Sequence, residues 1–210
     1  MSKHVIIIEF PWGRDKDPRV PLGHASLIST LECSSNISYS SLIYPVNEAT
    51  EYLIEHIISE INDISEEYSD VDIAIGVYVW AEDIIQNLLF AIRNTGFLGR
   101  IILGGPQITY SGPGLEAIYP DADIFVRGYG ELALLSILQN KKIPIPGVHY
   151  AGELDLCQQT SVDLEILPSP WLNGVISLEE QKFIRWETQR GCPFRCGFCQ
   201  HKEAGKRLKK

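Results

Sequence analysis

Short runs of apolar residues alternate with amphipathic segments through the first 140 residues of this chain. The runs Val5–Glu9 and Ile73–Val79 are apolar almost throughout, as expected of strands that are buried on both faces of a sheet. The segment Glu48–Tyr68 instead repeats isoleucine and leucine at three- and four-residue steps against glutamates, which predicts an amphipathic helix. Strands that alternate with helices in this way favour a parallel α/β sheet.

The expected elements follow one another in regular order. We expect five strands, at Val5–Glu9, Ile37–Tyr44, Ile73–Val79, Arg100–Leu103 and Asp123–Val126. We expect five helices, at Pro21–Leu31, Glu48–Tyr68, Glu82–Asn94, Leu115–Tyr119 and Glu131–Leu138. Because crossovers between parallel strands are right-handed, this order predicts a doubly wound, parallel five-stranded sheet of the Rossmann type. One such domain accounts for residues 1–140.

The loops after the expected strands are the candidate ligand-binding segments, because doubly wound sheets bind ligands beyond the carboxyl ends of their strands. These loops are rich in glycine, proline and aromatic residues. Either they let a flat ligand approach the backbone closely, or they are ordinary turns. The candidate cofactor-binding residues are Gly104, Gly105, Pro106, Gly128 and Gly130.

The regular alternation stops after residue 140. Residues 141–181 contain four prolines and several apolar side chains, which predicts a linker packed onto a neighbouring element. The segment Lys182–Glu187 is interpreted as a new strand, and three cysteines follow it. We therefore expect a first domain at 1–140, a linker at 141–181 and the start of a second domain at 182–210.

The charge distribution supports this division. The formal net charge is -9, yet residues 182–210 hold nine Lys/Arg against two Asp/Glu, while the other 181 residues hold nine against 25. An acidic chain is a poor general nucleic-acid binder, because neutralising phosphates requires basic surface.

The sequence has no apolar run of membrane-spanning length and no signal-peptide pattern. We expect a cytoplasmic protein that binds neither nucleic acid nor membrane.

The three clustered cysteines, Cys192, Cys196 and Cys199, have the spacing C-x3-C-x2-C. In a cytosolic chain, clustered thiols are typical of metal sites or of catalysis rather than of disulfides. Three thiolates on one loop can hold an iron–sulfur cluster and leave one iron open to another ligand. A closed zinc site needs four ligands, and His201 is the available fourth. The remaining alternative is three unligated, reactive thiols beside arginines.

This cysteine spacing after a strand, with Phe198 before the last cysteine, resembles that of the radical S-adenosylmethionine enzymes. In that family the three cysteines bind a [4Fe–4S] cluster, whose open iron is chelated by S-adenosylmethionine. The resemblance assigns this metal-binding role to Cys192, Cys196 and Cys199. It implies reductive cleavage of S-adenosylmethionine to a 5′-deoxyadenosyl radical, with a flavodoxin or ferredoxin as reductant. The substrate class, a small molecule or a peptide, stays open.

The flanking residues resemble one branch of the family more closely. Glu187–Phe194 is similar to the E-T-x-R-G-C-P-F motif of the branch that has an amino-terminal cobalamin-binding-like domain. Four further segments are similar to that branch, at Asp17–Gly23, Ile102–Pro106, Val126–Glu131 and Leu167–Leu172. The resemblance implies a cobalamin-binding-like domain with corrinoid-facing glycine loops. A linker and a (β/α) barrel follow this domain in that branch.

Three departures from the family pattern qualify these expectations. No histidine lies in a D-x-H-x-x-G motif, so either cobalamin binds without a histidine ligand or the domain has lost the cofactor. His24, early in an expected helix, is interpreted as a packing residue. Tyr129 replaces the usual glutamate of the R-G-E-G-E segment. The chain ends eleven residues after Cys199, so we expect only the first strand and the cluster loop of the barrel, which is then incomplete.

These features predict the amino-terminal portion of a radical S-adenosylmethionine enzyme. The expected chemistry of the whole enzyme is cobalamin-dependent methyl transfer or another radical reaction, and we expect little turnover from 210 residues alone, because radical chemistry needs a closed site that excludes water. The alternative is a non-catalytic module that binds a corrinoid or a partner and carries a vestigial or zinc-binding cysteine tail.

Overall fold

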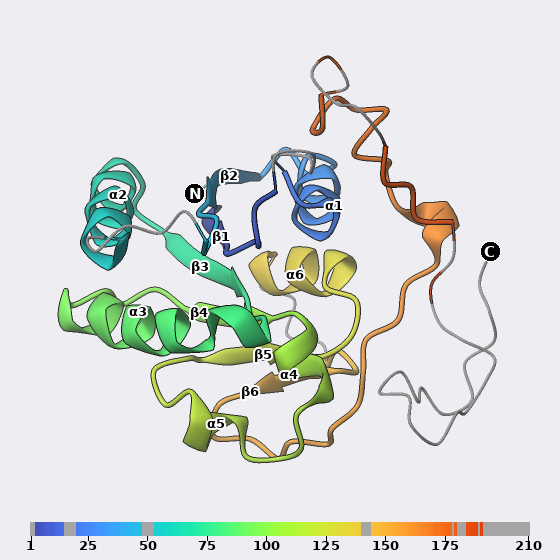
Figure 1. Cartoon of the computed structure of the whole chain (residues 1–210). Helices are drawn as coiled ribbons and strands as arrows, with labels where there is room; N and C mark the ends of the chain where they lie inside the picture. Colours follow the sequence, from blue (N-terminus) through green and yellow to red (C-terminus); the bar gives the residue numbers. More distant parts are fainter. Residues whose placement is uncertain are drawn as a thin grey trace.

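A computed structural model describes residues 3–14, 20–47, 53–139, 144–177, 179, 184–188 and 190, and the structural statements below concern these residues. They form a sheet between two layers of helices (Figure 1). Helices α1 and α6 pack on one face, and α2 and α3 pack on the other. None of the described helices is both long and apolar enough to cross a membrane.

The sheet has six strands in the order β2-β1-β3-β4-β5-β6. They are β1 (Lys3–Glu9), β2 (Ile37–Ile43), β3 (Val71–Gly76), β4 (Ile101–Gly104), β5 (Ile124–Val126) and β6 (Val148–Tyr150). The first five are parallel, as predicted, but β6 pairs antiparallel with β5. The expected count of five strands is therefore wrong. Strand β5 is equally short but is a continuous apolar run, whereas β6 has the sequence Val-His-Tyr, which shows neither an apolar run nor a clear alternation.

The helices follow the predicted order with one addition. They are α1 (Leu22–Leu31), α2 (Leu53–Glu67), α3 (Glu82–Asn94), α4 (Pro106–Tyr110), α5 (Leu115–Ile118) and α6 (Glu131–Leu138), with short 3-10 turns η1 (Val79–Ala81) and η2 (Leu164–Ile166). The predicted bounds of α3 and α6 match the structure in full. Helix α4 was not predicted, because Pro106 was expected in the loop that follows the strand Arg100–Leu103. In the structure it stands at the first helical position, where proline is well tolerated.

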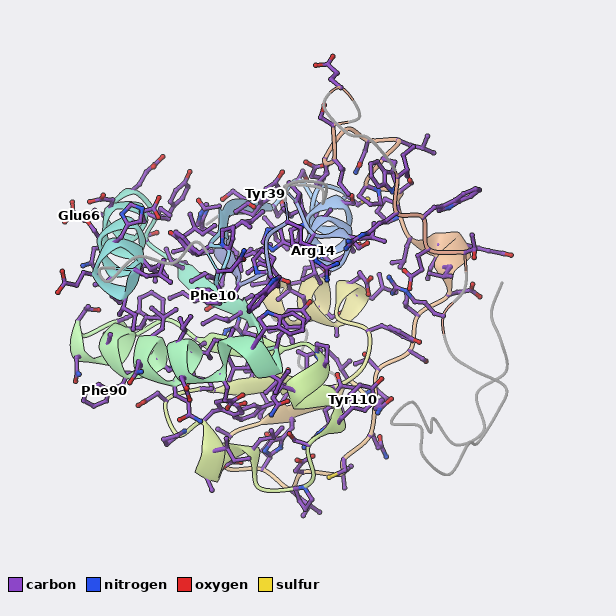
Figure 2. The ribbon with its side chains drawn as sticks, in the orientation of Figure 1. Phe10, Arg14, Tyr39, Glu66, Phe90 and Tyr110 are labelled. Carbon is purple, nitrogen blue, oxygen red and sulfur yellow. The ribbon has the colours of Figure 1, made fainter. Side chains whose placement is uncertain are left out.

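Strand β1 is buried on both faces, as its apolar sequence predicts. Ile6 and Ile8 pack against α2 and α3, while Val5 and Ile7 pack against α1 and α6. Phe10 lies inside the molecule just beyond the strand, whereas Glu66 and Phe90 project from the outer faces of α2 and α3 (Figure 2). The core therefore consists of two apolar layers separated by the sheet.

The carboxyl-terminal segment departs from the predicted pattern. Within the strand expected at Lys182–Glu187, the described residues 184–187 adopt neither helix nor strand. A strand is stable only when a neighbour pairs with its backbone, and no described strand pairs with this segment. The predicted metal ligands Cys192, Cys196 and Cys199 lie outside the described residues.

A buried ion pair ties the central strands together and generates a stability prediction. The Asp72 side chain is 1% exposed and accepts hydrogen bonds from Arg100 Nε at 3.0 Å and Nη2 at 2.5 Å. Lys3 Nζ lies 3.0 Å from its other oxygen. We expect Asp72→Ala to lower the free energy of unfolding by about 3 kcal/mol, because it leaves two cations without their buried partner. Urea denaturation at pH 7 measures this.

Asp70→Ala is the matched control, since Asp70 pairs with the same Lys3 but its side chain is 45% exposed. Exposed ion pairs contribute little, so we expect a loss below about 1 kcal/mol. Equal losses in the two variants would contradict a special role for the buried carboxylate.

Candidate ligand-binding site

A cavity of about 310 Å³ lies at the carboxyl edge of the sheet. Its walls are the ends of β1 and β3, the first turns of α1 and α6, the loops after β4 and β5, and the side chains of Glu187 and Arg190. The chain passes from β1 to β2 on one side and then returns to β3 on the other. The cavity therefore occupies the topological switch point, where doubly wound sheets bind their ligands.

Four of the five predicted glycine-loop residues line this cavity: Gly104, Gly105, Gly128 and Gly130. Pro106 is not among the lining residues and begins α4. Gly105 has φ 97° and ψ -179°, and a Cβ there would lie 2.8 Å from the carbonyl oxygen of Val77. Gly128, at φ 87°, would place a Cβ 2.5 Å from the carbonyl oxygen of Thr160. Close packing of backbone on backbone thus accounts for these two glycines.

Glu9, the last residue of β1, forms part of the cavity floor and is 5% exposed. Its carboxylate lies over Gly76 of β3, where a Cβ would come within 2.3 Å of Oε2. Tyr78 forms a side-chain hydrogen bond with it. Burial raises the pKa of Glu9 to about 7, although the Tyr78 hydrogen bond opposes this. Near neutral pH the carboxyl therefore exists in both protonation states.

His24 also lines the cavity, from the first turn of α1. Its Nε2 lies 2.8 Å from the hydroxyl oxygen of Ser41 in β2, and within the described chain its Nδ1 has no hydrogen-bond partner. Burial lowers the pKa of His24 to about 4, so the ring is neutral at pH 7. The side chain packs as its sequence position suggested, but one ring nitrogen is left without a partner beside the cavity.

An ion pair joins α6 to the carboxyl-terminal segment at the cavity wall. Arg190 Nη2 lies 2.6 Å from Glu131 Oε1 and 2.8 Å from Glu187 Oε2, and its guanidinium carbon lies 4.9 Å from the ring centroid of Tyr129. The Glu131 carboxylate, in the first turn of α6, also interacts favourably with the helix dipole. Glu131 Oε2 and Arg190 Nη1 are buried and have no hydrogen-bond partner in the described chain. In the sequence, Cys192 follows Arg190 by two residues.

Aromatic residues connect the loops that follow β1 and β3. Tyr78 and Trp80 are stacked, with ring centroids 4.7 Å apart and planes inclined by 13°. The indole Nε1 of Trp80 donates a hydrogen bond to the backbone carbonyl of Phe10 at 2.9 Å. Nearly half of the Trp80 side chain is nevertheless exposed. The pair therefore fixes the relative positions of the two loops at the switch point.

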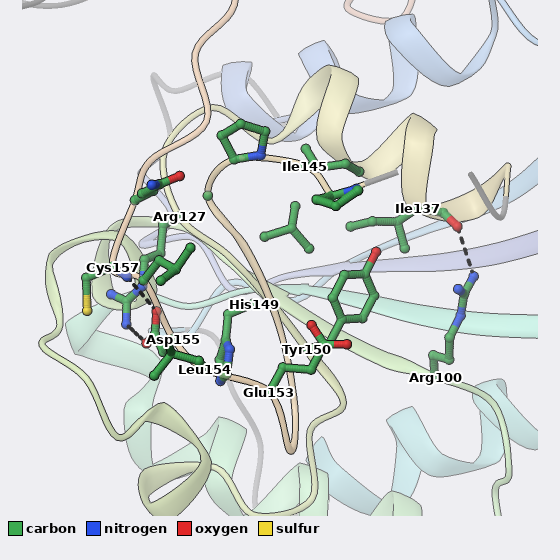
Figure 3. A pocket seen from close by; sticks show the side chains of 16 residues that line it. Arg100, Arg127, Ile137, Ile145, His149, Tyr150, Glu153, Leu154, Asp155 and Cys157 are labelled. Carbon is green, nitrogen blue, oxygen red and sulfur yellow. Dashed lines mark hydrogen bonds and ion pairs between the residues drawn. The ribbon is translucent and has the colours of Figure 1, made fainter. Parts of the chain in front are cut away.

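A second, larger cavity of about 770 Å³ lies beside β6 (Figure 3). Its most buried polar group, Arg127, donates hydrogen bonds to the carbonyls of Ile108 and Gly112 and to Asp155 Oδ2 at 2.7 Å. Burial alone would raise the pKa of Asp155, but the Arg127 contacts bring it below its usual value. Two buried polar atoms of this cavity, Arg127 Nε and His149 Nδ1, also have no hydrogen-bond partner in the described chain. We assign the candidate site to the smaller cavity because it lies at the topological switch point and is lined by the predicted glycine loops.

Sequence reasoning located the glycine loops but not the cavity floor. Glu9 did carry a signal, since it is a single carboxylate at the end of an otherwise apolar, buried strand. Tyr78 lies at the expected carboxyl end of a strand, where ligands bind, and His24 was interpreted as a packing residue. Their contacts at the cavity depend on the segments that pack around them. Among the described residues, no group of three His, Cys, Asp or Glu side chains is arranged to hold a metal ion.

Comparisons with known proteins identify relatives of the chain. No family model matches it. It is 27% identical over 165 residues to a 2-(S-pantetheinyl)-carbapenam-3-carboxylate methyltransferase of Streptantibioticus cattleyicolor, covering 68% of this chain and 24% of that protein. It is 25% identical over 176 residues to the cobalamin-dependent radical SAM methyltransferase TokK of Streptomyces tokunonensis, covering 75% and 24%. The chain thus spans about a quarter of the length of these curated relatives.

Solved structures show a similar fold. The cobalamin-dependent S-adenosylmethionine radical enzyme OxsB, with aqua-cobalamin and S-adenosylmethionine bound, matches with a TM-score of 0.65 at 19% identity. The match covers 96% of this chain and 29% of that one. An apo form of OxsB gives a TM-score of 0.63 at 21% identity. The chain therefore shares the fold of part of that enzyme.

The geometry of Gly105 generates a second prediction. We expect Gly105→Ala to lower the free energy of unfolding by about 3 kcal/mol, because its backbone conformation is almost exclusive to glycine and a Cβ would overlap Val77. The neighbouring Gly104→Ala is the matched control, since a Cβ there meets nothing closer than 3.8 Å and costs less than about 1 kcal/mol. Urea denaturation of both variants measures the difference, and equal losses would contradict this account.

The raised pKa of Glu9 generates a third prediction. The folded state holds this proton more tightly than the unfolded state, so the Glu9 contribution to stability falls as pH rises from about 4.5 to 7. We expect Glu9→Gln to gain about 2 to 3 kcal/mol relative to the parent chain between pH 5 and pH 8. Urea denaturation at several pH values measures this. The exposed Glu66→Gln is the control, and a pH-independent difference for Glu9→Gln would contradict the shift.

Proposed function

We propose that this chain is the amino-terminal part of a cobalamin-dependent radical S-adenosylmethionine enzyme. Its relatives confirm its resemblance to such enzymes. In this proposal residues 1–140 form a corrinoid-binding domain and residues 182–210 carry a [4Fe–4S] cluster for reductive cleavage of S-adenosylmethionine. The activity of the whole enzyme would be methyl transfer to a small molecule or peptide. A flavodoxin or ferredoxin would supply the electron.

The residues around the switch-point cavity fit a corrinoid. A volume of about 310 Å³ is at the lower end of ligand pockets, so it accommodates one flat appendage while the macrocycle lies across the opening. Three buried polar atoms at its wall have no hydrogen-bond partner among the described residues: His24 Nδ1, Glu131 Oε2 and Arg190 Nη1. Buried polar atoms are nearly always hydrogen-bonded, so unpartnered ones beside a cavity favour a polar ligand. The carboxamide groups around a corrin offer both the donors and the acceptors that these atoms need.

When bound, a corrinoid supplies a cobalt centre that can carry a methyl group. The residues of this chain would bind and orient it. Gly104, at the end of β4, and Gly130, at the start of α6, line the cavity without adding a side chain. The stacked pair of Tyr78 and Trp80 offers an aromatic surface at the switch point. Leu27 and Leu134 provide apolar wall that excludes water from the cavity.

One observation carries the proposal further than the fold alone: the segment that leads to the cysteines borders the same cavity. Arg190 is bound to Glu131 at the cavity wall, and Cys192 lies two positions further along the sequence, a chain distance of at most about 8 Å. This supports an arrangement in which the cluster and the corrinoid are held close together. Cys192, Cys196 and Cys199 would hold three irons and leave the fourth for S-adenosylmethionine.

Metal analysis of the anaerobically reconstituted chain tests the cluster. We expect about four irons and four acid-labile sulfides per chain, as for a [4Fe–4S] cluster, and loss of both in Cys196→Ala. Cys157→Ala is the matched control, because this exposed cysteine lies outside the motif, and it should keep full occupancy. One zinc per chain, retained in air and lost in His201→Ala, would instead identify the non-catalytic module and contradict the proposal.

A further inference from the structure

Glu9 is a buried carboxyl group without a cationic partner. It is 5% exposed, and within the described chain no lysine or arginine forms an ion pair with it. Glutamate is rarely buried to this extent unless it is paired. Its one side-chain hydrogen bond is with Tyr78, and the carboxylate fits over β3 because residue 76 is glycine. The fold therefore keeps a destabilising group at the floor of the candidate ligand cavity.

The protonation state of Glu9 sets the charge at the cavity floor, because the other ionisable groups of the cavity are either neutral or paired. They come from the loop after β3, from α1, from α6 and from the carboxyl-terminal segment, and they are Tyr78, His24, Glu131, Glu187 and Arg190. Burial lowers the pKa of His24 to about 4, and burial together with Glu9 raises the pKa of Tyr78, so both are neutral between pH 6 and 8. Arg190 is held by Glu131 and Glu187.

We propose that Glu9 and Tyr78 form a proton-gated recognition site for a neutral, flat heterocycle that carries an acceptor nitrogen, such as the benzimidazole in the nucleotide tail of a corrinoid. This inference rests on the proposed corrinoid function and adds a determinant of specificity to it. The protonated carboxyl of Glu9 donates a hydrogen bond to the nitrogen, and the Tyr78 hydroxyl donates to the remaining carboxyl oxygen. Ionised Glu9 has no proton to donate and presents a charge to a neutral, acceptor-bearing ring.

The proton held by Glu9 predicts how the affinity for the heterocycle changes with pH. Binding leaves the proton on Glu9, so binding to the ionised form must take up one proton from solvent. The affinity for the heterocycle then falls by up to about tenfold for each pH unit above the pKa of the free protein. Because burial raises the pKa of Glu9 to about 7, this dependence lies within the pH range where the other shifted groups of the cavity do not titrate.

The experiment measures dissociation constants for the full chain by anaerobic equilibrium dialysis at pH 6 and pH 8. The two probes are cob(II)alamin and cob(II)inamide, which lacks the nucleotide tail. We expect the affinity for cob(II)alamin to fall about tenfold from pH 6 to pH 8. The affinity for cob(II)inamide should change less than about twofold, because that ligand places no acceptor nitrogen on Glu9.

Glu9→Gln is the decisive variant, because its amide donates a hydrogen bond at every pH. It should bind cob(II)alamin with little pH dependence, and comparison with the parent chain on the same ligand cancels any titration of the ligand. Glu66→Gln is the matched control. It removes an exposed carboxylate of α2, outside the cavity, and should keep the tenfold pH dependence.

The outcomes separate this inference from the proposed function. A pH dependence that persists in Glu9→Gln, or that is equal for the two corrinoids, overturns the gating role while corrinoid binding itself stands. Failure of the parent chain to bind either corrinoid overturns the proposed corrinoid site, and the gating role with it. A circular dichroism spectrum and a urea midpoint for each variant show that it is folded at both pH values.

Discussion

The position of β1 between β2 and β3 is the constraint on which the candidate site depends. The chain leaves β1 toward β2 on one side of the sheet and returns to β3 on the other, so its connections diverge at the carboxyl ends of β1 and β3. A cavity opens at these ends between α1 and α6. The parallel pairing of β1 with both neighbours then places Glu9 next to Gly76 at the cavity floor. The cavity and its polar floor therefore follow from the same topology.

Electrostatics divides the molecule into a structural part and a part suited to ligand binding. Deep in the sheet, Asp72 is matched by Lys3 and Arg100, and near β6 the charge of Arg127 is matched by Asp155. At the switch point the balance is incomplete, because Glu9 forms no ion pair with a cation of the described chain, while buried polar atoms without hydrogen-bond partners occur at both cavities. Buried polar groups that the fold leaves unsatisfied are expected at sites completed by another molecule. The buried carboxyl of Glu9, which has no cationic partner among the described residues, distinguishes the smaller cavity from the larger one.

The ion pair between Glu131 and Arg190 connects these features to the carboxyl-terminal segment. The sequence has an acidic first part and a basic last part, and this ion pair is one direct contact between them. Tyr129, at a position where the related motif has glutamate, packs its ring against the guanidinium instead of adding a second charge. A site at the switch point is thereby bordered by the segment that leads into the cysteine motif.

The sequence by itself determined the alternation of strands and helices, the glycine-rich loops and the cysteine motif. These features are local, because periodicity and turn chemistry are encoded within a few neighbouring residues. Only the tertiary structure decided that β6 pairs with β5, that Glu9 lies over Gly76, that His24 keeps one ring nitrogen unpartnered, and that Arg190 reaches Glu131. Each of these depends on segments far apart in the chain, whose proximity is set by packing and topology rather than by any local pattern.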